Sequence, residues 1–221
     1  MRSENQPGGQ HGSRGDAERS FIERARRAQI VEAAVEVIAA RGFARASLAR
    51  IAERAGISKG VISYHFAGKS ELIEQLVRQV YERIGVFVAE RLEGQSVSAA
   101  WIRLYVSSLA TYMQGHRVQL AALGEIFGNY RTPEGELRYG VASSEEMYQG
   151  LEAAFREGQA NGEFREFDTR VMAVTFQSSV DSMFAYWMTY PERDLTAYAR
   201  ELAGLFVHAM CLPGRQETTG T

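Results

Sequence analysis

The sequence predicts an all-α protein. Apolar residues recur at spacings of three and four along most of the chain, and no sustained alternation of apolar and polar residues marks a strand. The four prolines, Pro7, Pro133, Pro191 and Pro213, stand where tails or loops are expected, so they leave the long helical patterns uninterrupted. With 221 residues, 45% of them hydrophobic, the chain can form one large or two small helical domains.

The order of these patterns divides the chain into four parts. Residues 1–16 are polar and rich in Gly, Ser and Gln, which predicts a disordered tail, and residues 213–221 are expected to form a flexible tail. Between the tails we predict a small N-terminal domain over 17–68 and a larger helical domain over 69–212. A long helix at the start of the second domain, about 69–92, is expected to join the two.

The individual helices are predicted from apolar faces and capping residues. The first, at about 17–41, carries one apolar face and ends before Gly42, a residue suited to a left-handed C-cap. Two short helices follow within residues 47–66, before the joining helix. Later helices are predicted at about 98–113, 118–130, 144–161, 169–189 and 194–212.

Residues 47–66, SLARIAERAGISKGVISYHF, have the properties of a helix-turn-helix. This motif needs two helices that cross steeply through a short turn, often with glycine. Gly56 permits the reversal because glycine adopts positive φ at low cost. Ile51, Ile57 and Ile62 can hold the two helices together from behind. A generic helical hairpin with a glycine turn is the alternative, but the pattern favours a helix-turn-helix.

The second short helix keeps a small and polar outer surface, which fits the major groove of DNA. A helix N-terminus and several polar side chains flank it and are suited to phosphate contacts. Tyr64 and His65 have packing as an alternative role, and Phe66 is expected in the core. The predicted DNA contacts are Ser47, Ser58, Lys59, Gly60, Val61, Ser63, Tyr64, His65 and Lys69.

At this point the sequence resembles a known family. Gly56-Ile57-Ser58-Lys59-Gly60, followed by Tyr64-His65-Phe66, Lys69 and Leu72, is similar to the signature of the tetracycline-repressor (TetR) family. The resemblance implies an all-α homodimer, in which an N-terminal three-helix domain binds DNA and a larger helical domain binds a small inducer and dimerises. The chain departs from the family pattern in two places: Ser63 stands where an aromatic residue is frequent, and Ala67-Gly68 stands where Pro-Ser is common. The second departure weakens the expected cap of the joining helix.

The charges are distributed unevenly. Residues 1–70 hold 12 Lys and Arg against 7 Asp and Glu, whereas residues 71–221 hold 13 against 20. A basic front attracts a polyanion and an acidic back avoids one. The only two lysines, Lys59 and Lys69, both lie in the basic part. This asymmetry is consistent with operator DNA as the partner.

The larger domain is rich in aromatic residues, which serve either core packing, the more common role, or contact with a ligand. Asp181 stands out because it interrupts an apolar helix four residues after Gln177, and Glu125 occupies a similar setting. A buried acid must be paired or hydrogen-bonded. Aromatic rings around an acid would favour a cationic or amphipathic effector. The candidate ligand residues are Trp101, Tyr105, Tyr112, Glu125, Phe127, Tyr148, Phe176, Gln177, Asp181 and Phe184.

The last two helices, within 169–212, are predicted to form a homodimer. A palindromic operator requires two reading helices about 34–36 Å apart, so a monomer would regulate poorly. The helix at about 194–212 carries a broad apolar stripe that could instead belong to the internal core: Leu195, Tyr198, Leu202, Leu205, Phe206 and Ala209.

Other functional classes find little support. The sequence has no nucleophile elbow, phosphate loop or cluster of metal ligands, so we expect no enzyme, metal or cofactor. No apolar run is long enough for a membrane span, and the single cysteine, Cys211, fits a reducing, cytoplasmic location. The leading interpretation is a repressor released by a small effector; the alternative is an architectural or cell-division factor that binds DNA without an effector.

Overall fold

The computed structural model describes residues 11–212, with side chains from Phe21 onward; residues 1–10 and 213–221, which hold most of the two predicted tails, lie outside this range. Apart from two isolated bridge pairs, the described residues are helices and loops, which confirms the all-α class. The helices are α1 (His11–Arg41), η1 (Phe43–Arg45), α2 (Leu48–Ala55), α3 (Lys59–His65), α4 (Lys69–Leu92), α5 (Ala99–Gly115), α6 (Arg117–Asn129), η2 (Val141–Ser144), α7 (Glu145–Ala160), α8 (Thr169–Thr189) and α9 (Leu195–Met210).

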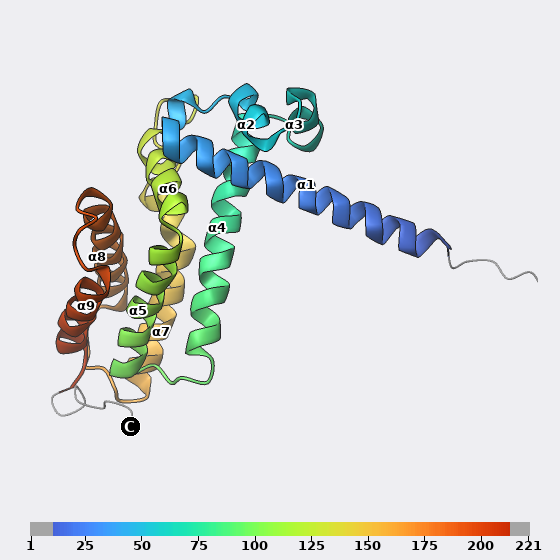
Figure 1. The fold of residues 1–221 in the computed structure, drawn as a ribbon. Coiled ribbons are helices and arrows are strands. Elements are labelled where there is room, and N and C mark those ends of the chain that lie inside the picture. Colours follow the sequence, from blue (N-terminus) through green and yellow to red (C-terminus); the bar gives the residue numbers. More distant parts are fainter. Residues whose placement is uncertain (1–10, 213–221) are drawn as a thin grey trace, which may run out of the picture.

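Helix α1 begins earlier than the sequence predicts. It starts at His11, so residues 11–16 continue the helix instead of belonging to the tail. A polar segment can extend an existing helix because each added residue gains a hydrogen bond, whereas the costly nucleation step has already occurred in the packed part. In Figure 1 this N-terminal part of α1 projects away from the rest of the molecule.

The buried side chains form two clusters that α4 connects. One cluster lies between α1, α2, α3, the first half of α4, and α6. The other lies between the end of α4 and α5, α7, α8 and α9. Figure 1 shows α2 and α3 at one end of the molecule and α8 and α9 along the side opposite the projecting part of α1. Because α6 contributes Ala122, Leu123 and Ile126 to the first cluster, the two predicted domains share a packed interface.

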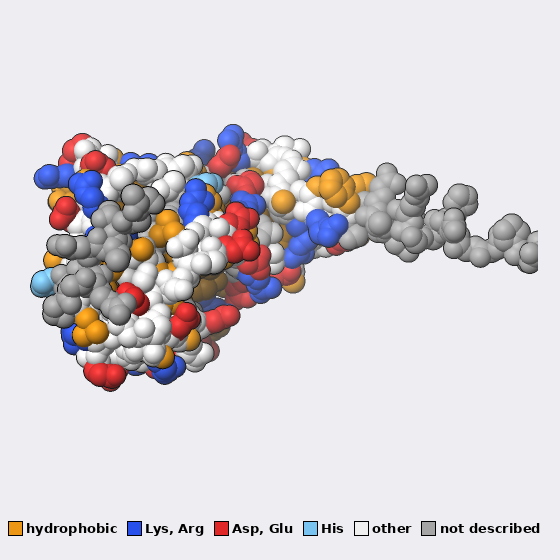
Figure 2. Space-filling model, turned by 90° about the horizontal axis from the view of Figure 1, so that it is seen from below, with side chains coloured by type: hydrophobic (Ala, Val, Ile, Leu, Met, Phe, Trp, Pro, Cys, Tyr) orange, Lys and Arg blue, Asp and Glu red, His pale blue; other side chains and the backbone are white. Residues whose placement is uncertain are grey.

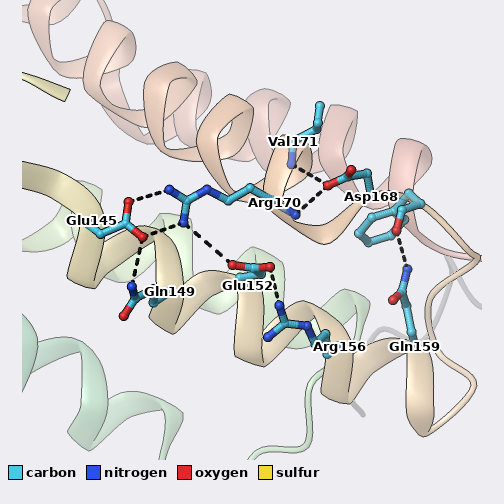
Figure 3. A network of polar contacts seen from close by, with 9 residues as sticks. Glu145, Gln149, Glu152, Arg156, Gln159, Asp168, Arg170 and Val171 are labelled. Atoms are coloured by element: carbon cyan, nitrogen blue, oxygen red, sulfur yellow. Dashed lines mark hydrogen bonds and ion pairs between the residues drawn. The ribbon is translucent and has the colours of Figure 1, made fainter. Parts of the chain in front are cut away.

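A network of charged side chains joins α7 to α8 (Figure 3). Arg170 at the start of α8 donates to Glu145 with an Nη1–Oε1 distance of 3.0 Å, and lies 3.7 Å from an oxygen of Glu152. Asp168 caps α8 by accepting the backbone N–H groups of Arg170 and Val171, both at 2.9 Å. The start of α8 is thereby fixed against α7. None of the helices in the described range is long and apolar enough to cross a membrane.

Candidate nucleic-acid interface and effector site

Helices α2 and α3 meet in the geometry that the sequence predicts for a helix-turn-helix. Gly56 ends α2 with φ of 67°, in the left-handed region where glycine is favoured. Ser58 caps α3 and its hydroxyl accepts the N–H of Val61 at 3.4 Å. Ile51 and Ile62 are fully buried. The apolar side of α3 is therefore held from behind, and its other side is free to face outward.

The outward side of α3 carries the predicted reading residues. The side chains of Ser58, Lys59 and Ser63 are exposed, as are Gly60 and the N-cap residue Ser47. Tyr64 is 83% exposed, which makes packing a poor explanation for this aromatic residue. An exposed tyrosine at the end of a short polar helix can donate its hydroxyl to a phosphate. The predicted surface exists as a continuous face, and its contact with DNA stays a prediction.

Three of the predicted DNA contacts, Val61, His65 and Lys69, are less accessible than the others. Val61 and His65 are only partly exposed. Phe66 is 2% exposed and lies in the core, as expected. Lys69 does not offer the mobile charge that we expect from its position at a helix start. Its ammonium donates to the carbonyl oxygen of Phe43 at 2.7 Å, and desolvation lowers the pKa of Lys69. A phosphate contact from this side chain would require it to leave that carbonyl.

The end of α3 is held by two residues that the sequence interpretation missed. Arg27 of α1 donates to the carbonyl oxygen of His65, lies 4.2 Å from the ring centroid of Phe66, and pairs with Glu71 at 3.3 Å. Glu71 also accepts the backbone N–H of Ala67 at 2.6 Å, and this hydrogen bond, followed by the bond from Arg27, lowers the pKa of the Glu71 carboxyl. The Glu71 carboxylate thus fixes the backbone just before α4, while the first turn of α4 has no side-chain cap from Gly68.

The end of the molecule opposite α2 and α3 has a different distribution of charge. Figure 2 shows this end from below, where acidic, basic and apolar side chains are interspersed. The exposed charged residues of α2 and α3 are Arg50, Glu53, Arg54 and Lys59, so basic groups outnumber acidic ones there, although Arg54 pairs with Glu36 of α1. A polyanion is therefore expected to approach the α2–α3 end.

Comparison with known proteins identifies the segment around this motif. Residues 30–76 match the family model described as bacterial regulatory proteins of the tetR family. Over 66 residues the chain is 47% identical to the HTH-type transcriptional regulator BetI 1 of Chromohalobacter salexigens; the match covers 30% of this chain and 33% of that protein. The segment that holds α2 and α3 is therefore similar to the TetR family. This match spans only about a third of the length of BetI 1.

Longer similarities extend over the C-terminal helices. The Bacillus subtilis fatty acid metabolism regulator is 26% identical over 186 residues, which cover 81% of this chain and 92% of that protein. The crystal structure of FadR from Bacillus subtilis with stearoyl-CoA has a TM-score of 0.70 at 24% identity, covering 81% and 96% of the two chains. SmeT, the repressor of the Stenotrophomonas maltophilia efflux pump SmeDEF, has a TM-score of 0.72 at 20% identity, covering 88% and 96%. These structures show that their fold extends over more than four fifths of this chain.

Within the C-terminal helices, three polar side chains gather around Asp181. We call Tyr81 of α4, Tyr105 of α5, and Gln177 and Asp181 of α8 the Asp181 cluster. The Nε2 atom of Gln177 donates to Asp181 at 2.8 Å, whereas its Oε1 atom is buried without a hydrogen-bond partner. Burial raises the pKa of Tyr105 to about 12, and the nearby charge of Asp181 contributes to this shift. The same two causes raise the pKa of Tyr81.

Aromatic rings surround this cluster. Trp101 stacks on Tyr105 with ring centroids 5.2 Å apart, and Phe176 lies 5.7 Å from the Tyr105 ring. Phe127 lies 6.2 Å from the ring of Tyr81. The structure therefore brings six of the ten predicted ligand residues to one region: Trp101, Tyr105, Phe127, Phe176, Gln177 and Asp181. Tyr81 was missed, although it continues the face that Val77 and Ile84 mark at helical spacing.

The other four predicted ligand residues have different surroundings. Glu125 accepts the backbone N–H of Phe43 at 3.0 Å, so its carboxylate faces η1. Tyr112 stacks on His116 at 3.9 Å and lines a separate recess of about 530 Å³ between α4 and α5. Tyr148 is buried beneath Arg170, and Phe184 is buried in the C-terminal core. Their surroundings account for these side chains through packing or hydrogen bonds.

Helices α8 and α9 leave apolar side chains exposed on the chain described. Val171 is 63% exposed and Leu205 is 70% exposed, and Tyr186 and Tyr198 lie across the two helices with ring centroids 5.8 Å apart. Other members of the predicted stripe on α9 belong to the internal core instead: Leu195, Leu202 and Phe206. The predicted stripe thus divides into a buried part and an exposed part.

Proposed function

We propose that this chain is a cytoplasmic transcriptional repressor that binds a palindromic operator as a homodimer and is released by a small effector. The observation that carries the proposal is the outward face of α3, which holds exposed Lys59, Ser63 and Tyr64 over a fully buried Ile62. A helix held in this way can enter the major groove without unfolding its own core. The C-terminal helices supply the dimer surface and the effector site.

For the dimer we propose the exposed apolar residues of α8 and α9 as the contact. Val171 and Leu205 would leave water when a second copy packs against them, which is favourable for association. Two copies related by a two-fold axis would present two α3 helices to successive major grooves. Light scattering at micromolar concentration tests this part: a mass of two chains is expected, and Leu205→Glu should shift it toward one chain.

For the effector we propose an organic cation with an apolar body, bound at the Asp181 cluster. Asp181 is exposed to solvent, and desolvation by the groups around its carboxyl raises its pKa. An ammonium N–H could satisfy the unpaired Oε1 of Gln177 and interact with the carboxylate of Asp181. The rings of Trp101 and Tyr105 offer stacking and cation–π contacts. FadR of Bacillus subtilis was solved with stearoyl-CoA and SmeT with triclosan, so related folds accommodate small molecules.

The experiment first selects bound duplexes from a random pool with the wild-type protein. The selected operator should be palindromic, and its affinity should fall steeply as salt rises. 4-Phenylbutylamine is then titrated into the Trp187→Phe variant, in which Trp101 is the only tryptophan, and its fluorescence is followed. The amine is expected to quench Trp101 and to weaken operator binding. Failure of any duplex to be enriched would contradict the repressor, whereas operator binding without any response to amines would favour the architectural factor.

A further inference from the structure

The single turn η1 connects α1 to α2 and has little internal support. It contains three residues, none of them buried, and it follows Gly42, whose φ is 80°. Its position sets where α2 begins, because the backbone N–H of Ser47 and the guanidinium of Arg50 both donate to the carbonyl oxygen of Arg45, at 3.1 and 2.7 Å. Whatever holds η1 therefore also holds the N-terminus of α2.

Phe43 of η1 is held by side chains from two other helices. The carboxylate of Glu125, on α6, accepts the N–H of Phe43 at 3.0 Å. The ammonium of Lys69, on α4, donates to the carbonyl oxygen of Phe43 at 2.7 Å and lies 4.2 Å from the centroid of its ring. The ring also stacks on Tyr130 at 5.2 Å. We call Phe43, Lys69, Glu125 and Tyr130 the Phe43 clamp.

The same helix that carries Glu125 also reaches the Asp181 cluster. Two residues later, Phe127 lies 6.2 Å from the ring of Tyr81, whose pKa is raised in part by the charge of Asp181. Glu125 and Phe127 thus lie on one short stretch of α6, between η1 and the candidate effector site. A shift of α6 that follows occupation of the cluster would move the carboxylate that holds Phe43.

The surroundings of Gly42 make this contact sensitive to position. A Cβ atom at Gly42 would lie 3.1 Å from the Glu125 carboxylate, so the turn and α6 approach closely. Asn129 supports the carboxylate from the far side, with its amide 3.4 Å from the same oxygen. The acceptor is therefore oriented toward η1 by groups on its own helix.

We propose that Glu125 and Lys69 are positioning residues that transmit the state of the effector domain to the DNA-reading helices through Phe43. This proposal rests on the proposed function. An effector at the Asp181 cluster displaces α6, the Glu125 carboxylate leaves the N–H of Phe43, and the start of α2 loses its fixed position. Glu125, predicted from sequence as a ligand residue, acts in this scheme without contact with the ligand.

The test compares Glu125→Ala with Glu125→Gln and with Glu157→Ala, a control on the exposed side of α7. Operator affinity is measured with and without 4-phenylbutylamine, and the ratio of the two affinities is the readout. In Glu125→Ala, affinity should fall about tenfold because a backbone N–H loses its charged acceptor. The preferred operator sequence should not change, and the ratio should approach one although the amine still binds. Glu125→Gln, whose amide oxygen can accept, should retain most of the ratio.

A residue with a purely structural role would lower operator affinity and leave the ratio unchanged, and that outcome would overturn the proposal. If 4-phenylbutylamine does not bind the wild type, the proposed effector class is wrong, and hydrogen exchange then decides on the clamp. The amide of Phe43 and those of residues 47–50 should exchange faster in Glu125→Ala than in Glu157→Ala. Equal exchange in the two variants would also overturn the proposal.

Discussion

Polar and apolar side chains are arranged in opposite ways in the reading head, which consists of α2 and α3, and in the Asp181 cluster. On α3, polar side chains are exposed and the apolar residues behind them are fully buried, so function lies on the outside of a small core. In the Asp181 cluster, polar groups lie among rings, and one of them, Oε1 of Gln177, is buried without a partner. The first arrangement needs only a rigid support. The second leaves one buried acceptor, Oε1 of Gln177, without a donor from the described residues.

The largest expected effect distinguishes the buried side of α3, which supports the helix, from its exposed side, which is proposed to contact DNA. Ile62→Ala removes a fully buried side chain and should lower the free energy of unfolding by about 2–5 kcal/mol. Ser63→Ala, one residue away and exposed, should change it by less than about 0.5 kcal/mol. Urea denaturation of both variants measures the difference. Similar values for the two would mean that α3 is not supported by its inner face.

The next prediction tests whether operator binding by α3 and amine binding at the Asp181 cluster are independent. Lys59→Ala should weaken operator binding about tenfold and reduce the salt dependence by about one unit per subunit if Lys59 meets a phosphate, with amine binding unchanged. Asp181→Asn should leave operator binding unchanged in the absence of amine, but weaken the binding of 4-phenylbutylamine. Fluorescence anisotropy and calorimetry measure the two affinities. If each variant affected both, the regions would not act as separate sites.

The smallest effect concerns pH. Desolvation raises the pKa of Asp181, and the hydrogen bond from Gln177 partly opposes this shift. The charged carboxylate binds a cation, so amine affinity should rise with pH through the raised pKa and then level off. Below that pKa, amine affinity should fall by at most about tenfold for each unit that the pH decreases. Calorimetry between pH 5 and pH 8 measures it, and an identical profile for Asp181→Asn would exclude this carboxylate as the titrating group.

The same contrast explains what sequence alone could predict. The head is local: Ser47, Gly56 and Ser58 act on neighbours within a few residues, so their spacing is enough to place α2 and α3. The hydrogen bond of Glu125 could not be predicted because its partner, Phe43, lies 82 positions away, and an acid in an apolar helix does not indicate which group it will contact. The acceptor of Lys69 could not be predicted for the same reason, since it also lies on η1.

Elements were easier to predict than their contacts. Helices α4 and α8 begin and end where their apolar patterns and capping residues indicate, and α1 differs only at its polar start. Tyr105 faces the Asp181 cluster and Tyr112 does not, and this difference depends on how the helices are rotated about their axes relative to one another. No repeat or spacing within one helix contains that information.

The sharing of α6 by the N-terminal core has a practical consequence for protein engineering. A fragment cut after residue 68 would keep the whole DNA-reading motif but lose Leu72, Ile73 and Leu76 of α4 and the three buried residues of α6 that complete its interior. A chimaera that transplants this head onto another regulator would therefore need a compatible sixth helix as well. Specificity could be exchanged by redesigning the outer face of α3 alone, while the donor's junction stays intact.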